Sequence, residues 1–351
     1  VGQLAAVAKL IEAKPVAAAP QKVGGQLALL PIQARFFETP IARREHWNQS
    51  VMLQPQAPLD ASHLQAALAA LIEQHDALAL NFQASGDVWQ ATFQTQRDPE
   101  LLWVRELDSL DQLTALADLA QRSLDLQQGR LLRAVLANLP GGEQRLLLVI
   151  HHLVVDGVSW RVLLEDLQLG YTALASGKPL VLPGKSSTLQ SWAEHLHRYA
   201  QSETLSRERE YWLTTLSAGD VELPRDFAQD VQTQEQALRV SSRLSQALTH
   251  KLLKVAPAAY RTQINDLLLT ALARVLCDWS RQPSVLIQLE GHGREDLFEE
   301  LDLSRTVGWF SSLFPVRLTP QAGPGESLCA IKEQLRAVPG KGIGYGVLRY
   351  L

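Results

Sequence analysis

The short segment 145–150 constrains the fold of this chain more than any other feature of its sequence. It reads Arg-Leu-Leu-Leu-Val-Ile, and five consecutive apolar residues are typical of a strand that is buried on both faces. A second apolar segment, 131–137, precedes it, and the turn-forming residues Pro-Gly-Gly-Glu lie between the two. This pattern predicts two adjacent strands in a hairpin-like unit. The second strand leads directly into His151 and His152.

Strands and helices alternate along the rest of the chain. Apolar and alternating runs predict further strands at 47–53, 88–94, 101–104, 284–290 and 312–318. Apolar residues at helical spacing predict helices that begin near Pro31 and Trp160, and others at 62–75, 110–120, 191–216, 245–253, 262–279 and 326–337. Because the alternation occurs in both halves of a 351-residue chain, we predict an α/β protein with two lobes of similar build. The last six residues, 346–351, are strand-like.

Local composition indicates how the chain is divided. Residues 1–13 predict a helix of an upstream domain, and 14–27 have the Ala, Pro and Gly content of a linker. The Pro-, Gly- and Ser-rich stretch 176–187 marks a passage between lobes. We therefore expect an N-terminal lobe at 28–185 and a C-terminal lobe at 186–351. A first residue other than Met and an end just after a strand-like segment indicate a module cut from a longer polypeptide.

Charge and composition argue against several kinds of partner. The formal net charge is −4 and no basic stripe occurs, so neither nucleic acid nor an anionic membrane is expected as the main partner. No apolar run is long enough to span a bilayer, and no signal peptide opens the chain, so we predict a cytoplasmic protein. Cys277 and Cys329 lie in apolar helical patterns, so we expect buried thiols in a reducing compartment.

A first cluster of polar residues follows the strand 145–150 and ends where the next helix begins. Its members are His151, His152, Asp156, Gly157, Ser159 and Trp160. Adjacent residues of a strand point to opposite faces, so only one of the two histidines should reach a given cleft. Imidazole is the side chain best suited to exchange protons near neutral pH. A companion histidine, a nearby aspartate and a glycine turn favour a functional site over two hydrogen-bonded structural histidines.

Two members of this cluster are better explained by structure than by chemistry. Ser159 stands where a hydroxyl group caps the N-terminus of a helix, and we expect that role for it. Asp156 could orient a histidine or belong to a structural ion pair, and we favour the ion pair.

A second cluster follows the apolar strand 284–290 and contains Glu290, His292 and Arg294. Glycines on both sides of His292 permit a close approach of the backbone to another group. Burial at a strand end favours the neutral form of a carboxylate, which suits Glu290 for proton transfer. The alternative is a surface loop whose charged groups are solvated, and the flanking apolar strand makes us favour the first interpretation.

Several other chemistries lack their sequence patterns. No G-x-S-x-G elbow is present, which excludes one class of serine hydrolase. His151 and His152 have neither a helical i, i+4 partner nor neighbouring cysteines, so no metal site is expected. No P-loop or G-x-G-x-x-G fingerprint occurs, so no bound nucleotide is expected.

Together, these stretches resemble a known family. Residues 151–157 are similar to the HHxxxDG motif of the condensation-domain superfamily, which shares the chloramphenicol acetyltransferase-like fold. Further stretches resemble its epimerization branch in nonribosomal peptide synthetases, namely 31–37, 46–50, 158–160, 290–295, 305–310 and 340–346. The last three read EGHGRE, RTVGWF and GKGIGYG, and their joint occurrence in this order is highly specific. The resemblance covers residues 28–351.

This resemblance implies a fold and a set of site residues. We expect two chloramphenicol acetyltransferase-like lobes in a V with a tunnel between them. The family closes with a stretch that includes an FNYLG motif, and since this sequence has none, the second lobe is expected to be incomplete at its C-terminus. His152 and Glu290 are implied to face the substrate α-carbon from different lobes as the catalytic pair. Supporting or structural residues are implied to be His151, Asp156, Gly157, Ser159, Trp160, His292, Arg294, Trp309 and Tyr345, with no metal.

The resemblance also implies an activity and partners. The substrate would be an L-aminoacyl or peptidyl thioester on the 4'-phosphopantetheine arm of a peptidyl carrier domain upstream in the same polypeptide. Residues 1–13 would be the C-terminal helix of that carrier domain. The domain would bind no cofactor of its own, would invert the α-carbon, would pass the product to a downstream condensation domain, and would be monomeric. His152 and Glu290 would act as acid and base on opposite faces, or Glu290 alone would carry the proton while protonated His152 stabilises the enolate. The alternatives are a condensation domain and a non-catalytic module that docks a carrier.

Overall fold

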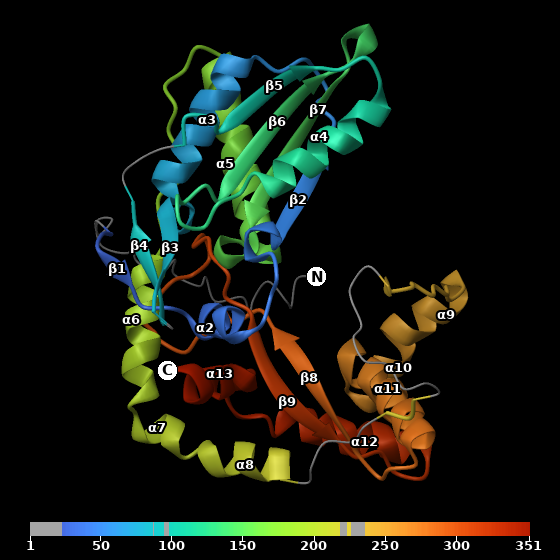
Figure 1. Ribbon diagram of the computed structural model, residues 1–351. Helices are drawn as coiled ribbons and strands as arrows, with labels where there is room; N and C mark the ends of the chain where they lie inside the picture. Colours follow the sequence, from blue (N-terminus) through green and yellow to red (C-terminus); the bar gives the residue numbers. More distant parts are fainter. Residues whose placement is uncertain (1–22, 87, 95–97, 218–222, 226–235) are drawn as a thin grey trace, which may run out of the picture. The chain divides into compact units, whose positions relative to one another are not determined.

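The computed structural model describes residues 23–86, 88–94, 98–217, 223–225 and 236–351 (Figure 1). The predicted helix 1–13 and most of the predicted linker 14–27 lie outside these residues. The chain forms two compact units, each of which is described separately below. Unit 1 comprises Val1–Ala200, Asp296–Ser311 and Tyr350–Leu351, and unit 2 comprises Gln201–Glu295 and Ser312–Arg349.

In the described part of unit 1, the larger sheet has the strand order β2-β7-β6-β5. The bounds of its strands are β2 Asn48–Leu53, β5 Leu102–Glu106, β6 Leu132–Asn138 and β7 Gln144–His151. As predicted, β6 and β7 are antiparallel neighbours, and residues 146–151 of β7 are all buried. The remaining pairs are an antiparallel β2–β7 and a parallel β5–β6.

Helices cover the larger sheet on both faces. Helix α4 (Leu110–Arg122) contacts β6 and β7, where its Ala120 joins a core cluster with Val135 and Val149. Helices α3 (Ala61–Gln74) and α5 (Gly157–Ala175) pack against each other, and Figure 1 shows them behind the sheet while α4 lies in front. The helices on both faces explain why β7 is buried on both sides, as its apolar run predicted.

A smaller sheet of unit 1 has the order β1-β4-β3, with β1 Gln26–Leu27, β3 Leu80–Ser85 and β4 Val88–Phe93. Strand β3 was not expected from the sequence, because it buries little beyond Leu80 and Phe82. Helices α2 (Pro31–Glu38) and α6 (Leu189–Ala200) complete the unit.

The first unit extends beyond the expected boundary after residue 185. Trp192 of α6 is buried against Phe298 and Phe310, and His197 contacts the carbonyl oxygen of Leu29, so α6 belongs to unit 1. The segment 296–311 also returns to unit 1 from the second half of the chain. Each unit is therefore built from segments that are distant in sequence.

In the described part of unit 2, β8 (Val285–Gly291) pairs antiparallel with β9 (Ser312–Leu318). Helices α8 and α12 contact β9, α11 contacts β8, and a core cluster includes Trp212, Cys277, Phe314, Val316 and Ile331. The helices of this unit are α7 Glu203–Ser206, α8 Arg209–Ser217, α9 Gln246–His250, a π-helical turn at Lys251–Val255, α10 Ala256–Tyr260, α11 Ile264–Ser280, α12 Pro324–Arg336 and α13 Ile343–Tyr350.

Three expectations about local structure are wrong. The single helix at 191–216 is instead α6, α7 and α8, because the Ser202 hydroxyl accepts from Leu205 N and caps a new helix. The strand-like end at 346–351 belongs to α13, whose buried Ile343 and Val347 are spaced as on one helix face. Cys277 is buried as expected, but Cys329 is exposed on α12. Among the described helices, none combines the length and apolar character needed to cross a membrane.

Candidate active site

The histidine pair stands where β7 ends, and the two imidazoles have different surroundings. His151 is the last residue of β7 and is fully buried. Its Nε2 lies 2.8 Å from the Arg44 carbonyl oxygen, its Nδ1 accepts from Leu153 N at 3.1 Å, and its ring meets that of Phe36 edge-on. Burial lowers the pKa of the His151 imidazole to about 4. A neutral, fully bonded ring of this kind supports the structure.

His152 is half-buried and belongs to a chain of side-chain contacts. Its Nδ1 lies 2.8 Å from the Val155 carbonyl oxygen, and its Nε2 lies 3.0 Å from Nε2 of Gln49 on β2. The Oε1 atom of the same Gln49 side chain accepts from the indole N–H of Trp160 at 2.8 Å. The Trp309 ring packs on the imidazole with centroids 4.3 Å apart. These contacts fix the position and plane of the His152 ring.

Asp156 caps the helix that follows the histidines. Its Oδ1 accepts from Ser159 N at 2.8 Å, and its Oδ2 accepts from Phe310 N at 3.2 Å. The expectation that Ser159 caps this helix is wrong, because Asp156 stands at the cap position before Gly157. The favoured ion pair of Asp156 stays a prediction.

Ser159 instead joins α5 to the RTVGWF segment, 305–310. The hydroxyl lies 2.8 Å from Asp156 Oδ1 and 2.9 Å from the Gly308 carbonyl oxygen, and it accepts from Gly308 N at 3.1 Å. Gly157 has no left-handed φ, and a side chain there would meet no atom within 4 Å. A side chain at position 157 would therefore point into open space.

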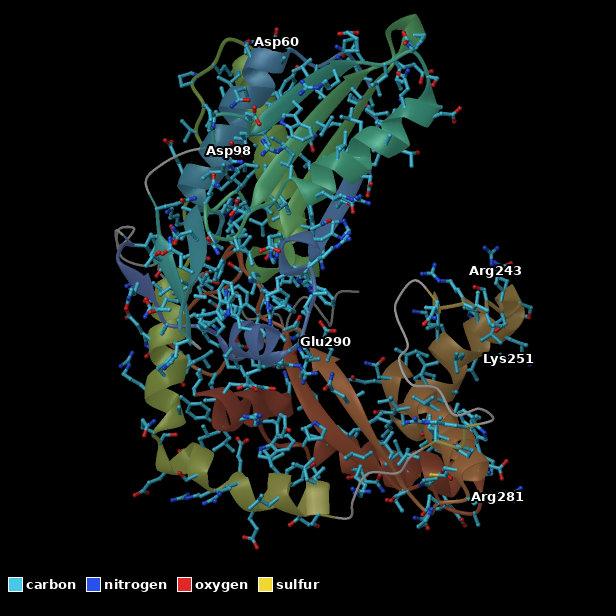
Figure 2. All side chains as sticks on the ribbon, viewed as in Figure 1. Asp60, Asp98, Arg243, Lys251, Arg281 and Glu290 are labelled. Carbon is cyan, nitrogen blue, oxygen red and sulfur yellow. The ribbon has the colours of Figure 1, made fainter. Side chains whose placement is uncertain are left out.

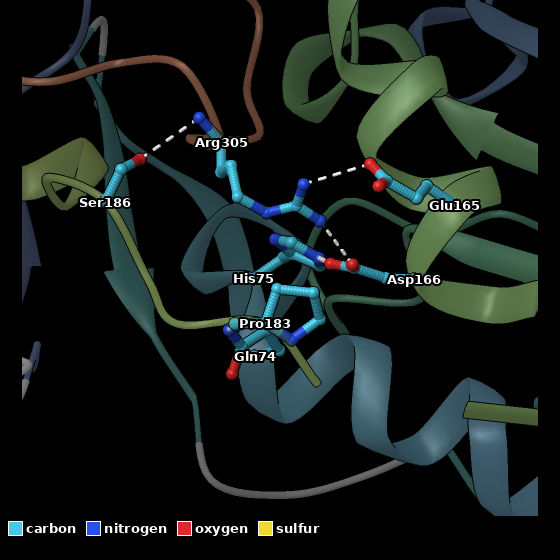
Figure 3. Close-up of polar contacts among 7 residues, drawn as sticks. All are labelled: Gln74, His75, Glu165, Asp166, Pro183, Ser186 and Arg305. Carbon is cyan, nitrogen blue, oxygen red and sulfur yellow. Dashed lines mark hydrogen bonds and ion pairs between the residues drawn. The ribbon is translucent and has the colours of Figure 1, made fainter. Parts of the chain in front are cut away.

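The segment 305–310 is held to unit 1 by a second set of contacts, shown in Figure 3. The Arg305 guanidinium contacts Glu165 at 2.9 Å and also the buried carboxylate of Asp166. The other oxygen of Asp166 lies 2.9 Å from Nε2 of His75, which is also buried. Sequence reasoning missed His75 and Asp166, because their spacing of 91 residues gives no local pattern.

The PIQ sequence at 31–33 also supports the histidine loop. The Gln33 amide is fully buried, where its oxygen accepts from Leu30 N at 3.0 Å and its nitrogen donates to the Leu153 carbonyl oxygen at 3.0 Å. Unit 1 thus gathers the predicted residues His151, His152, Asp156, Gly157, Ser159, Trp160 and Trp309 around one loop. Four of the stretches that the resemblance singled out lie in this unit, namely 31–37, 46–50, 158–160 and 305–310.

Glu290 is the next-to-last residue of β8, near the carboxyl end of the strand in Figure 2. Its side chain is exposed, so the expected burial of this carboxylate is wrong. The physical reason is the alternation of the strand: Ile287 and Leu289 pack on the core of unit 2, while Gln288 and Glu290 point away from it. A solvent-facing carboxylate at a strand end remains accessible to a substrate.

The loop after Glu290 is tied to the GKGIGYG segment, 340–346. Glu295 Oε1 lies 3.2 Å from His292 Nε2, and its Oε2 lies 2.6 Å from Lys341 Nζ. The backbone N–H of Arg294 donates to His292 Nδ1 at 2.9 Å. Tyr345 packs edge-on against the buried Trp212. The predicted residues Glu290, His292, Arg294 and Tyr345 therefore all belong to unit 2.

His152 and Glu290 belong to different units, so their predicted approach to one α-carbon stays a prediction. Among the residues that the structure describes, no three His, Cys, Asp or Glu side chains form a group that could hold a metal ion. The polar groups available for chemistry are an oriented imidazole in unit 1 and an accessible carboxylate in unit 2.

Known proteins similar to this chain share its fold. A structure of the epimerization domain from the third module of tyrocidine synthetase B has a TM-score of 0.87 and 36% identity, over 95% of this chain and 76% of that one. The condensation domain of the monacolin K polyketide synthase has a TM-score of 0.72 and 17% identity, over 93% of this chain and 76% of that one, which shows the fold alone. The predicted α/β, chloramphenicol acetyltransferase-like fold class is confirmed.

This chain spans only a small part of the far longer relatives that it matches. One of the linear gramicidin synthase proteins of Brevibacillus parabrevis is 46% identical over 358 residues, which are 99% of this chain and 7% of that protein. Surfactin synthase subunit 1 of Bacillus subtilis (strain 168) is 40% identical over 94% of this chain and 9% of its own length. The family model described as Condensation domain matches residues 23–351. This chain belongs to the condensation domain family.

Proposed function

We propose that this chain is an epimerization domain of a nonribosomal peptide synthetase. Its substrate is an L-aminoacyl or peptidyl thioester on the 4'-phosphopantetheine arm of a carrier domain, and its product is the L/D mixture. The observation that carries the proposal is the 36% identity and TM-score of 0.87 to an epimerization domain, over 95% of this chain. The partners would be the carrier and the condensation domain of the next module, with no cofactor resident in the domain itself.

Inversion requires that the α-carbon lose its proton on one face and gain one on the other. A base takes the proton, the C–H electron pair moves into the thioester to form an enolate, and an acid returns a proton to carbon. The α-proton of a thioester is far less acidic than an imidazolium, so a base alone is insufficient and the enolate oxygen needs hydrogen-bond donors. The backbone N–H groups of Gly157 and Val158 at the start of α5 are candidates, since the N-terminus of a helix attracts negative charge and those of Ser159 and Trp160 already donate to Asp156.

His152 and Glu290 are the proposed proton-transfer groups. In a two-base scheme they act on opposite faces of the α-carbon, and in a one-base scheme Glu290 carries the proton while protonated His152 stabilises the enolate. The remaining predicted residues would support this pair within each unit. His151, Asp156, Ser159, Trp160 and Trp309 lie around His152, His292 and Arg294 belong to the loop after Glu290, and Tyr345 packs on Trp212 in the core of unit 2.

A carrier loaded with one L-aminoacyl group in D₂O tests the proposal. We expect the protein to introduce deuterium at the α-carbon and to produce the D-form, as read by mass and by chiral analysis of the released amino acid. A condensation domain would be inert with one loaded carrier and would form a dipeptide with two. A docking module would give neither product, and either result would overturn the proposal.

Variants of the two groups refine the same assay. Glu290→Gln and His152→Gln should each reduce exchange by about 10²-fold or more, because each removes one proton-transfer group. Glu210→Gln on α8 and His250→Gln on α9 are matched controls, since both residues are exposed and outside the motifs. Full exchange in Glu290→Gln would remove Glu290 from the mechanism.

A further inference from the structure

Gln49 and Trp160 make polar contacts beside His152, and the mechanism above assigns neither of them a part in the proton transfer. Gln49 lies on β2, and Trp160 lies in the first turn of α5. The contacts form one chain: Trp160 Nε1 to Gln49 Oε1 at 2.8 Å, Gln49 Nε2 to His152 Nε2 at 3.0 Å, and His152 Nδ1 to the Val155 carbonyl oxygen at 2.8 Å.

Each end of this series of hydrogen bonds is a group that can only donate or can only accept. An indole N–H only donates, so the Gln49 atom that faces Trp160 must be its oxygen, and its NH₂ group then faces His152. A carbonyl oxygen only accepts, so His152 Nδ1 must carry a hydrogen toward Val155. The remaining ring nitrogen, Nε2, therefore accepts from the Gln49 amide and holds no hydrogen.

A protonated His152 would break this chain. Its Nε2–H would point at the NH₂ group of Gln49, so two donors would face each other. Rotation of the amide by half a turn would not solve the problem, because the NH₂ group would then face the N–H of Trp160. The contacts are satisfied together in one state of the ring, the neutral tautomer with hydrogen on Nδ1.

The backbone holds the three side chains in place. Gln49 pairs with Ile150 in the β2–β7 ladder, and His152 N donates to the Trp47 carbonyl oxygen at 2.9 Å. Trp160 is buried, and its backbone N–H donates to the Asp156 carbonyl oxygen at the start of α5. The Trp309 ring restricts rotation of the imidazole from one side. The amide and the imidazole are thus kept at hydrogen-bond distance by separate elements of unit 1.

We infer that Gln49, itself fixed by Trp160, is a positioning residue that makes His152 enter the reaction as a proton acceptor at Nε2. The inference rests on the proposed epimerization. In the step, the Nε2 lone pair takes the α-proton, the C–H electron pair moves into the enolate, and the ring becomes an imidazolium. The Gln49 N–H must leave Nε2 as the α-carbon approaches, since the nitrogen has one lone pair. This order disfavours the scheme in which an already protonated His152 stabilises the enolate.

The tautomer can be measured without any activity. Nitrogen NMR of the 351-residue chain labelled with ring-¹⁵N histidine, near neutral pH, should show an unprotonated Nε2 and a protonated Nδ1 for His152. The His152→Gln variant assigns that signal among the nine histidines. An imidazolium, or a ring with hydrogen on Nε2, would overturn the inference. If this tautomer were found in a protein that inverts no thioester, the proposed function would fail while the assignment of the ring stood.

Substitutions at position 49 separate positioning from packing. In Gln49→Glu one carboxylate oxygen still accepts from Trp160, and the other requires a hydrogen on His152 Nε2, so the signal should change to a protonated Nε2. Removal of the α-proton by His152 should then fall by about 10²-fold or more, because the base is lost. Gln49→Met should keep the Nδ1–H tautomer, which Val155 still holds, and lose less activity than Gln49→Glu.

Two further variants complete the test. Gln83→Glu adds the same charge at an exposed position of β3 and should leave both the His152 signal and the exchange rate unchanged. Trp160→Phe releases the amide to rotate, so His152 should show a mixture of Nε2 states even if Gln49→Glu fails to fold. An unprotonated Nε2 in both Gln49→Glu and Trp160→Phe would show that the hydrogen bonds from Trp160 through Gln49 do not set the protonation state of His152.

Discussion

The ring of Trp309 lies against the imidazole of His152, with centroids 4.3 Å apart and planes inclined by 34°. The two residues are more than 150 positions apart, and the contact exists because residues 296–311 return to unit 1. Phe36 lies beside the same tryptophan and also meets the ring of His151. The RTVGWF and HHxxxDG sequences therefore build one aromatic cluster, in which the His152 ring is seated.

Replacing Trp309 should affect both the position of His152 and the stability of the fold. Trp309→Ala should lower the α-deuterium exchange rate by about 10²-fold, because a loosely held imidazole is displaced from the reacting carbon. It should also reduce the free energy of unfolding by about 3–5 kcal/mol. Trp309→Phe retains a ring and removes an indole N–H that has no hydrogen-bond partner among the described residues. It should therefore change the exchange rate and the free energy of unfolding only slightly. Equal exchange rates in the Ala and Phe variants would contradict this role.

The Ser159 hydroxyl should be worth more to stability than an ordinary surface hydroxyl. Ser159→Ala leaves the buried N–H of Gly308 without its acceptor, which should cost about 1–3 kcal/mol in the free energy of unfolding. Urea denaturation measures the difference. The control is Ser62→Ala, which removes an exposed hydroxyl that contacts Asp60 and should change stability by less than about 0.5 kcal/mol. A loss no larger than the control's would show that the contact to 308 is dispensable.

The order of elements was largely predictable from sequence, because it depends on local periodicity. The run at 145–150 predicted a strand buried on both faces, and the structure shows β7 between β2 and β6 with helices on both sides. The end of the chain was not predictable in this way. Residues 346–351 alternate like a strand, but buried Ile343 and Val347 set a helical face that begins before that window.

The candidate site was predictable in its residue types and only partly in its contacts. Strand alternation correctly separated His151 from His152, and the helix that was expected to begin near Trp160 begins at Gly157. Asp156 caps the helix in place of the predicted Ser159, whose hydroxyl is hydrogen-bonded to Gly308, 149 residues away in the sequence. The role of Gln49 had no local signal either, since its partners His152 and Trp160 are 103 and 111 residues away.

Acidification should destabilise the protein partly through His151. Burial lowers its pKa to about 4 from the ordinary value of 6.5, so between these values the unfolded chain binds a proton that the folded protein does not. Stability from this group is therefore fully present above pH 6.5 and is lost as the pH falls toward 4. The full loss is about 3 kcal/mol.

The pH dependence of the free energy of unfolding in His151→Gln isolates this contribution. The variant should be less stable at pH 7, because it loses the fitted ring, but its stability should fall less steeply than that of the wild type between pH 6.5 and 4. His250→Gln, at an exposed histidine of α9, should keep the wild-type slope. Identical slopes in His151→Gln and the wild type would mean that His151 titrates normally in the folded protein.

The glycines of the GKGIGYG segment should differ in their tolerance of a side chain. Gly340 and Gly342 both have positive φ, of 49° and 90°, so alanine at either position is strained. At Gly340 a Cβ atom would lie 3.6 Å from its nearest neighbours, which is ordinary contact. At Gly342 it would lie 2.1 Å from the Phe314 ring, which is buried in the core of unit 2 and cannot withdraw.

We therefore expect Gly340→Ala to reduce the free energy of unfolding by about 1–2 kcal/mol through backbone strain alone. Gly342→Ala should lose about 2–5 kcal/mol, because overpacking of the core is added to the strain. Urea unfolding followed by tryptophan fluorescence suits the comparison, since Trp212 packs against Phe314 and should report the displaced ring. Equal losses in the two variants would show that Phe314 moves aside without cost, and that only the turn conformation requires glycine at 342.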